Sequence, residues 1–193
     1  MKNRILATAL GLAFSTGVFA QAGAGTVQRD VNQQRRIEQG LQSGQLNTRE
    51  AARLENEETK VQRDQARAMR DGSLSPAEKA RLAHEQNKVS RDISRERHDA
   101  QTGNPESASS QRMQADVQRN INQQQRIEQG VQSGSLTTRE TGRLERGEAQ
   151  VSRREARAGA DGNVNAKEQR RVQSAENRQS KRTYRQKHDR QRQ

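Results

Sequence analysis

Two histidine–aspartate pairs contain the side chains best suited to metal binding or proton transfer. They are His98-Asp99 and His188-Asp189. An imidazole beside a carboxylate can bind zinc or transfer a proton. Two adjacent residues of a helix point in different directions, however, so neither pair can hold a metal ion alone. We therefore prefer the interpretation that each histidine lies near a helix C-terminus, where the helix dipole favours a positive charge.

A second candidate is a turn sequence that occurs four times and carries a glutamate at a fixed position. Each copy has a glycine, an apolar residue two positions later, then Asn, Ser or Thr, and a Glu three residues after that. The copies span residues 43–50, 71–78, 133–140 and 161–168. In two of them an aspartate, Asp71 or Asp161, precedes the glycine. Carboxylates grouped in this way could contribute oxygen ligands to a calcium ion.

The two Asp-Gly copies resemble the second half of an EF-hand loop, and this resemblance implies calcium binding. The matching residues are Asp71, Gly72, Leu74 and Glu78, and Asp161, Gly162, Val164 and Glu168. The earlier loop positions that supply ligands in an EF-hand hold Arg67 and Met69 in one copy, and Arg157 and Gly159 in the other. A cation beside the ion opposes binding. We therefore predict no metal ligands, and keep a degenerate metal sensor or buffer as the alternative.

Helix capping explains the same turn residues without a metal. Glycine just past a helix adopts the left-handed conformation that closes the helix C-terminus. The polar residue after the apolar position can N-cap the next helix, and the Glu three residues later completes a capping box. The predicted N-caps are Asn47, Ser75, Thr137 and Asn165. Pro76 suits the first position of its helix, because a missing N–H costs nothing there.

No other motif of the chain indicates catalysis. The sequence has no nucleophile elbow, phosphate-binding loop or zinc-helix motif, and it has no cysteine. A chain with so few aromatic residues offers little to line a substrate pocket. We therefore predict that the protein is not an enzyme, with no catalytic residues and no cofactor.

The charge of the chain favours anionic partners. Lys and Arg number 36 against 24 Asp and Glu, which gives a formal net charge of +12. The basic residues are densest in the C-terminal stretch 178–193, where Asp189 is the one acid. Such a segment can bind polyanions, or it can be a solvated tail. Nucleic acid is not the expected partner, because an exported protein does not meet it and aromatic residues for base stacking are scarce.

The N-terminus has the features of an export signal. Lys2 and Arg4 precede an apolar run over residues 5–19, and Val18-Phe19-Ala20 has the small residues of a signal peptidase site. We predict residues 1–20 to be a signal peptide cleaved after Ala20, and the product to be periplasmic. The run is too short for a comfortable transmembrane helix.

The rest of the chain contains an internal duplication with a shift of 90 residues. Ile37-Glu38-Gln39-Gly40, for example, matches Ile127-Glu128-Gln129-Gly130. We predict an all-α fold of two tandem three-helix units, elongated and coiled-coil-like, over residues 27–101 and 117–190, the second with the basic tail. Residues 102–116, with Gly, Pro and Ser, are the expected linker. The expected helices span 27–42, 48–70, 76–98, 117–132, 138–160 and 166–189.

The apolar seams of these helices are narrow. Glu58 and Gln65 interrupt the seam of the second helix, and Gln86 interrupts that of the third. Glycines at 142, 147 and 159 replace better helix formers of the first unit, so we expect helix 138–160 to fray more than helix 48–70. The pattern predicts a marginally stable fold that could be completed by oligomerisation or by a partner.

The turn sequences also resemble the Leu-Thr-x-x-Gln motif of the Spy/CpxP-type periplasmic chaperones, with Glu in the Gln place. This resemblance rests on residues 46–50, 74–78, 136–140 and 164–168. It implies an exported, all-helical, chaperone-like protein. The whole chain resembles exported helical-repeat proteins of proteobacteria, which implies no particular function. Our hypothesis is a non-enzymatic periplasmic protein that binds anionic or partly unfolded partners, either an envelope protein or an anionic envelope surface. A metal sensor and a structural envelope protein are the alternatives.

Overall fold

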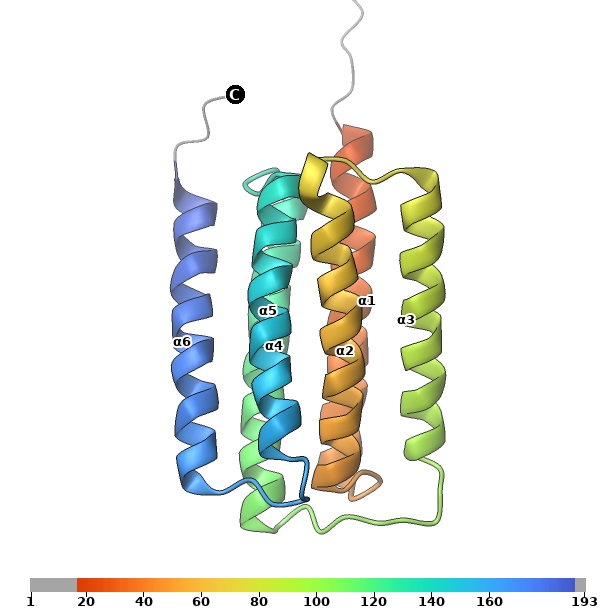
Figure 1. The fold of residues 1–193 in the computed structure, drawn as a ribbon, viewed down its shortest axis with the longest axis vertical. Coiled ribbons are helices and arrows are strands. Elements are labelled where there is room, and N and C mark those ends of the chain that lie inside the picture. The colour runs from red at the N-terminus through yellow and green to blue at the C-terminus, as the bar shows by residue number, and fades with distance from the viewer. Residues whose placement is uncertain (1–16, 190–193) are drawn as a thin grey trace, which may run out of the picture.

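The computed structural model describes residues 17–189, and these residues form a bundle of six α-helices (Figure 1). The helices are α1 (Gly17–Ser43), α2 (Thr48–Ala68), α3 (Pro76–Glu96), α4 (Ala108–Gln132), α5 (Thr138–Ala158) and α6 (Ala166–His188), with a short 3-10 turn, η1 (Met69–Asp71), after α2. No strand occurs in this range, so the all-α prediction is confirmed. The predicted signal peptide lies mostly outside the described residues, and its cleavage point after Ala20 falls in the first turn of α1.

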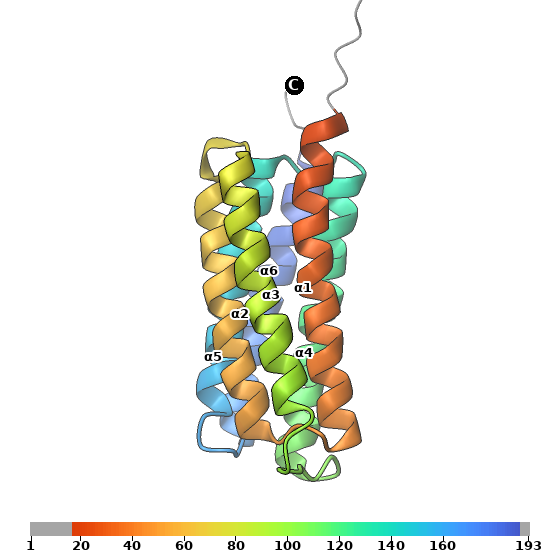
Figure 2. The same cartoon turned by 90° about the vertical axis from the view of Figure 1, so that its right-hand side faces the viewer.

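The six helices are arranged as two layers with a helix on each flank. Figure 2 shows α2 and α5 in one layer and α1 and α4 in the other. Helix α3 packs against α1 and α2, and α6 packs against α4 and α5 on the opposite flank (Figure 1). The most extensive packing joins α2 to α5 and α1 to α4. The N-terminal half (α1–α3) and the C-terminal half (α4–α6) therefore share one core.

Helices α2 and α5 run antiparallel. Gly142, near the start of α5, lies against Met69 at the end of α2, and Gly159 at the end of α5 lies against Ala52 near the start of α2. The segment expected as a linker is also held in place, because the Gly103 N–H donates to the Gly44 carbonyl at 2.8 Å. Helix α4 begins at Ala108, inside that segment, earlier than the sequence predicted.

The turn chemistry is as the sequence predicted. Complete capping boxes precede α2, α3, α5 and α6, with the predicted residues Asn47, Ser75, Thr137 and Asn165 as N-caps. The turn glycines 44, 72, 134 and 162 have φ values of 74°, 96°, 72° and 89°, a region that glycine enters without strain. These turns fix where each helix begins and hence which residues face inward.

The interior of the bundle is half polar. Apolar clusters occupy it together with a band of buried polar side chains, and the predicted seam interruptions Glu58, Gln65 and Gln86 are all buried. The band also contains Asp30, Gln33, Gln34, Glu55, Gln62, Asn120, Gln123, Gln124, Glu145, Glu148, Glu155, Glu176 and Gln179. Each buried polar group costs free energy unless it is hydrogen-bonded. This band therefore reduces the stability that the bundle gains from packing its interior.

The glycines of α5 have a packing role. A Cβ at Gly142 would lie 2.8 Å from the Met69 Cβ, and a Cβ at Gly159 would lie 2.8 Å from the Ala52 Cβ. A Cβ at Gly147 would clash with the side-chain amide of Gln179 on α6. The glycines thus allow α5 to approach both neighbours closely. This close approach offsets part of their low helix propensity.

No helix within residues 17–189 is both long enough and apolar enough to cross a membrane.

Candidate functional site

The outer face of the α2/α5 layer is lined by arginines, and we call it the arginine face. The outward positions follow one another at alternating spacings of three and four residues, which keeps them on one side of each helix. On α2 they are Arg49, Arg53, Asn56, Lys60, Arg63 and Arg67, with Arg70 just beyond, and on α5 they are Arg139, Arg143, Arg146, Gln150, Arg153 and Arg157. All are exposed, whereas the positions between them are buried or partly buried, apart from exposed Arg154.

The two basic stripes lie next to each other. Arg49 and Arg53 of α2 and Arg153 and Arg157 of α5 line one groove of about 410 Å³, whose floor includes alanines. Within the described chain, Arg63, Arg143, Arg146 and Arg153 of this face make no ion pair, whereas Arg67 pairs with Asp64 at 2.9 Å. The arginine face therefore presents cations whose guanidinium donors are largely available to a ligand.

The ends of this face fasten the two halves to each other. The Arg49 guanidinium donates to the Asp161 carbonyl at 2.8 Å, and the Arg139 guanidinium donates to the Asp71 carbonyl at 3.1 Å. Arg49 and Arg139 are 90 positions apart, as are Asp71 and Asp161. Each half thus caps the turn of the other, and these contacts fix the register of the two stripes.

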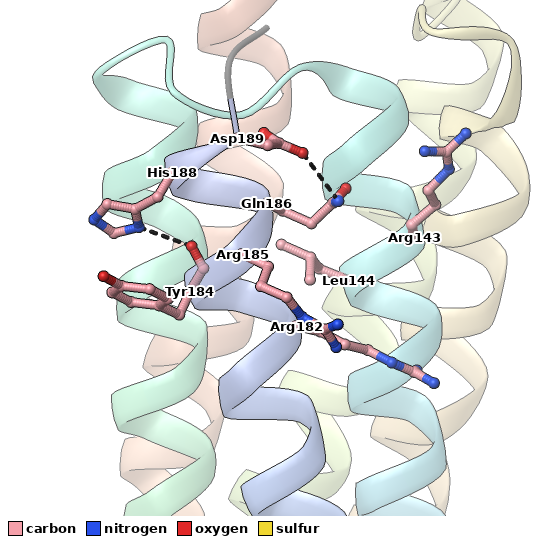
Figure 3. Close-up of a pocket in the computed structure, with 8 residues that line it drawn as sticks. All are labelled: Arg143, Leu144, Arg182, Tyr184, Arg185, Gln186, His188 and Asp189. Carbon is pink, nitrogen blue, oxygen red and sulfur yellow. Dashed lines mark hydrogen bonds between the residues drawn. The ribbon is translucent and has the colours of Figure 1, made fainter.

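A pocket of about 730 Å³ continues the positive surface around the edge between α5 and α6 (Figure 3). Its walls include Arg143 from the arginine face, Arg182 and Arg185 from α6, and the Leu144 side chain. Figure 3 shows the Gln186 amide donating to Asp189, at 3.4 Å, at the upper rim. The pocket combines a small apolar wall with three guanidinium groups, an arrangement suited to an anionic group.

The opposite face of the bundle, formed by α1 and α4, has a different composition, and we call it the amide face. Its outward positions have the same spacing of three and four residues and are mostly Gln or Asn. They are Gln28, Asn32, Arg35, Gln39 and Gln42 on α1, and Gln111, Ala115, Gln118, Asn122, Gln125, Gln129 and Gln132 on α4. Cations on the two-layer bundle are therefore concentrated on the α2/α5 side and on the flanking helices.

Five of the acidic residues of α2 and α5 face inward. Glu55, Glu58, Glu145, Glu148 and Glu155 are 0% or 1% exposed. Burial raises the pKa of Glu55 to about 7 and that of Glu148 to about 8. Burial also raises the pKa of Glu58 well above its ordinary value, and the nearby carboxyl of Asp30 adds to this rise. These raised pKa values keep a large share of the buried carboxyls protonated near neutral pH, so they do little to neutralise the arginines on the outer side of the same helices.

One buried hydrogen bond occurs in both halves with its partners exchanged. In the N-terminal half the Gln65 amide donates to the Asp30 carboxyl at 2.8 Å. At the positions 90 residues later, the Asn120 amide donates to the Glu155 carboxyl at 2.6 Å. Acid and amide have changed helices, yet one donor and one acceptor remain in each pair. Other bonds are unchanged between the halves, such as those of Gln34 to Glu55 and of Gln124 to Glu145, each at 3.2 Å.

The residues that sequence analysis weighed as metal ligands have other partners. Asp71 accepts from the Ser73 N–H, and Asp161 accepts from the Asn163 N–H, each at 2.9 Å, and both bonds stabilise the turns. Glu78 and Glu168 belong to capping boxes.

The two histidines lie at helix ends, as the preferred interpretation expected. His98 and His188 each place Nδ1 2.7 Å from the carbonyl four residues earlier, and the His188 ring stacks on Tyr184 with a centroid separation of 4.1 Å. His98 lies two residues after the last residue of α3, and His188 is the last residue of α6.

Sequence analysis did not identify the arginine face. The signal was present, because the arginines between 49 and 70 and between 139 and 157 follow one helical stripe each. The adjacency of the two stripes was not accessible, since it depends on the antiparallel packing of α2 against α5.

No protein-family model, curated protein or solved structure matches this chain.

Proposed function

We propose that the chain is a non-enzymatic binding protein of the bacterial envelope whose arginine face attaches to an anionic surface. The observation that carries this proposal is the pair of adjacent basic stripes on α2 and α5. The preferred ligands are the phosphate groups of anionic envelope lipids.

The dimensions of the face suit an extended anionic surface better than a single small anion. From Arg49 to Arg70 a helix rises about 30 Å at 1.5 Å per residue. Neighbouring helix axes are typically about 8–10 Å apart, so the two stripes make a broad, fairly flat strip. Arginine suits this role because its planar fork of donors matches phosphate geometry.

The exposed surface favours anionic partners over partly unfolded ones. A protein that holds unfolded clients needs exposed apolar side chains to contact them. Within residues 23–189, Tyr184 is the one large hydrophobic side chain that is exposed, at 63%. The chaperone-like part of the sequence hypothesis therefore receives less support than the anion-binding part.

A vesicle-binding experiment tests the proposal. The full chain is mixed with vesicles containing phosphatidylglycerol and with vesicles of phosphatidylcholine alone, and the bound fraction is measured by co-flotation. We expect binding to the anionic vesicles only. Binding should weaken strongly from 0.1 M to 1 M salt, because the screening length falls from about 10 Å to about 3 Å.

The decisive variant carries Arg63→Gln, Arg146→Gln, Arg153→Gln and Arg157→Gln. Each arginine near an anionic membrane contributes about 1 kcal/mol, so removing four should weaken binding by about 4 kcal/mol, roughly a thousandfold. The matched control removes the same charge from the flanks with Lys79→Gln, Arg91→Gln, Lys167→Gln and Arg171→Gln, which are all exposed. If both variants lose affinity equally, net charge alone drives binding and the arginine face is not the site.

The predicted export signal at 1–20 would deliver the protein to the periplasm, where anionic lipid surfaces are present. The two halves would be copies of one ancestral three-helix unit, because residues 90 positions apart repeat the same bonds, such as Arg36 to Ser90 and Arg126 to Ser180.

A further inference from the structure

Three carboxylates from separate parts of the N-terminal half meet at one end of the bundle. Glu50 lies in the first turn of α2, Glu96 is the last residue of α3, and Asp99 lies in the turn that follows α3. One oxygen from each of the three lies within 4.8 Å of the other two. Within residues 23–189 no other group of three or more acidic, histidine or cysteine side chains meets this criterion.

Glu50 is the unusual member of the group. The residue is 0% exposed, and its Oε2 accepts from the Asn47 N–H at 2.9 Å in the capping box. Its other oxygen, Oε1, is buried and has no hydrogen-bond partner. Burial raises the pKa of Glu50, and the neighbouring Asp99 and Glu96 carboxylates raise it further. A capping box alone uses one oxygen, so it does not account for the second one being buried beside two more acids.

The surrounding charges leave room for a ligand. Arg53 and Arg95 approach Glu96 at 3.8 Å and 3.7 Å, distances longer than a hydrogen bond. Both side chains are more than half exposed, at 58% and 65%, and the closer ion pair of Arg95 is with Asp92, at 2.7 Å, rather than with Glu96. The site lies at the C-terminal end of α3, and a helix C-terminus favours a positive charge. Asp99 is oriented by the Gln101 N–H, which donates to Oδ1 at 2.9 Å.

We propose that Glu50, Glu96 and Asp99 form a binding site for a hard divalent cation, Ca²⁺ in preference to Zn²⁺. The three ligands are all carboxylates, and Ca²⁺ takes six to eight oxygen ligands whereas Zn²⁺ prefers nitrogen and sulfur. Glu96 is half-buried and Asp99 is exposed, so water can fill the remaining coordination positions. The cation would satisfy the buried Glu50 oxygen and tie the start of α2 to the end of α3.

The C-terminal half contains a natural control for this site. The residues 90 positions later are Glu140, Gln186 and Asp189, so an amide stands where Glu96 supplies a carboxylate. The Gln186 amide donates to Asp189 at 3.4 Å, which partly satisfies that acid without an ion. The difference of one residue predicts one cation site in the molecule and not two.

Calorimetric titration of the full chain with CaCl₂ tests the proposal, with MgCl₂ and ZnCl₂ titrated separately. We expect one site with a dissociation constant of about 10⁻⁴ to 10⁻³ M, the range of extracellular calcium modules. The melting temperature followed by circular dichroism should rise with CaCl₂, because the ion binds only the folded chain. Absence of both heat and a melting shift at roughly ten times that concentration would overturn the proposal, as would tighter binding of Zn²⁺ than of Ca²⁺.

Two substitutions give each half the residue that the other half has at the matching position. Glu96→Gln makes the N-terminal site like its counterpart and should weaken Ca²⁺ binding at least about tenfold, while the chain without Ca²⁺ keeps its helical spectrum. Gln186→Glu completes the three acids in the C-terminal half and should raise the stoichiometry toward two.

Arg53→Gln removes a competing cation and should leave Ca²⁺ affinity equal or higher. Unchanged affinity in Glu96→Gln would show that the ion binds elsewhere and would refute this site. No lipid is present in these titrations, so their outcome is independent of the vesicle experiment.

Discussion

The outward and inward sides of α2 and α5 carry opposite types of ionisable residue. The outward stripe holds arginines at most positions, and the inward side of the same helices holds Glu55, Glu58, Glu145, Glu148 and Glu155. On the solvent side of a helix, acids and bases three or four residues apart can pair with each other. Here the acids are removed from water, so the arginines have few partners. The difference shows that the basic residues of these two helices lie at the surface, whereas most of their acidic residues lie in the interior.

The two sides should also differ in what they contribute. Exposed charges contribute little to stability, since substitutions there usually stay within about 0.5 kcal/mol. Buried carboxyls have large effects on stability, because each must be protonated, hydrogen-bonded or paired. We therefore expect ligand affinity to depend on the outward side and pH-dependent stability to depend on the inward side.

The largest expected effect is on the pH dependence of stability. Burial raises the pKa of Asp30 from 3.8 to about 7, that of Glu55 from 4.5 to about 7, and that of Glu148 from 4.5 to about 8. Between about pH 4 and pH 8 these carboxyls keep their protons in the folded chain and lose them in the unfolded chain. The free energy of unfolding should therefore fall as pH rises, by at least about 3 kcal/mol between pH 5 and pH 8. Urea unfolding followed by circular dichroism at these pH values measures it, and a constant or rising stability would contradict the buried acids.

Replacing one inward acid should have a smaller but opposite effect. Both carboxyl oxygens of Glu58 are buried without a hydrogen-bond partner. Glu58→Met should therefore stabilise the chain at pH 8 by about 1–3 kcal/mol, and by less at pH 5 where the acid is already neutral. The matched variant is Glu148→Met, 90 positions later, whose carboxyl accepts from the Gln179 amide at 3.0 Å. Glu148→Met should gain less, and equal gains would mean that the Gln179 bond contributes nothing.

The smallest effect concerns the exchanged hydrogen bond of the two halves. Gln65→Glu alone would place a second acid beside Asp30 and should destabilise the chain at pH 8. Adding Asp30→Asn recreates the Asn120–Glu155 arrangement of the C-terminal half and should recover part of that loss. A coupling of about 1–2 kcal/mol between the two substitutions is expected from denaturation midpoints of the four-member cycle. Additive effects would indicate that the two side chains do not interact.

Local features of this fold could be predicted from sequence, and its long-range pairing could not. The caps Asn47 and Ser75 and the turn glycines follow from residue types within a few positions. The buried Glu58 was visible as an interruption of an apolar seam. The packing of Gly142 on Met69 depends on the antiparallel arrangement of two distant helices, and no local pattern encodes it.

The candidate sites follow the same division. Each basic stripe could be predicted from the spacing of arginines along one helix, but the adjacency of the stripes could not. The meeting of Glu50 with Asp99 was likewise hidden, because each residue has a sufficient local role, one in a capping box and the other in a turn. Sequence reasoning placed Glu50 in a capping box and considered Asp99 only as the partner of His98, so it did not bring the two acids together.

The buried acidic band makes folding a proton-uptake reaction. The formal charge of +12 counts every acid as ionised, yet Asp30, Glu55, Asp116, Glu148 and Glu176 have pKa values of about 7 to 8 inside the bundle. The folded molecule is therefore more cationic than its composition states. Each unfolding event near neutral pH releases protons to the buffer, so the apparent heat of unfolding depends on the ionisation enthalpy of that buffer. Acidification alone would therefore raise the free energy of unfolding of the bundle and increase its positive charge.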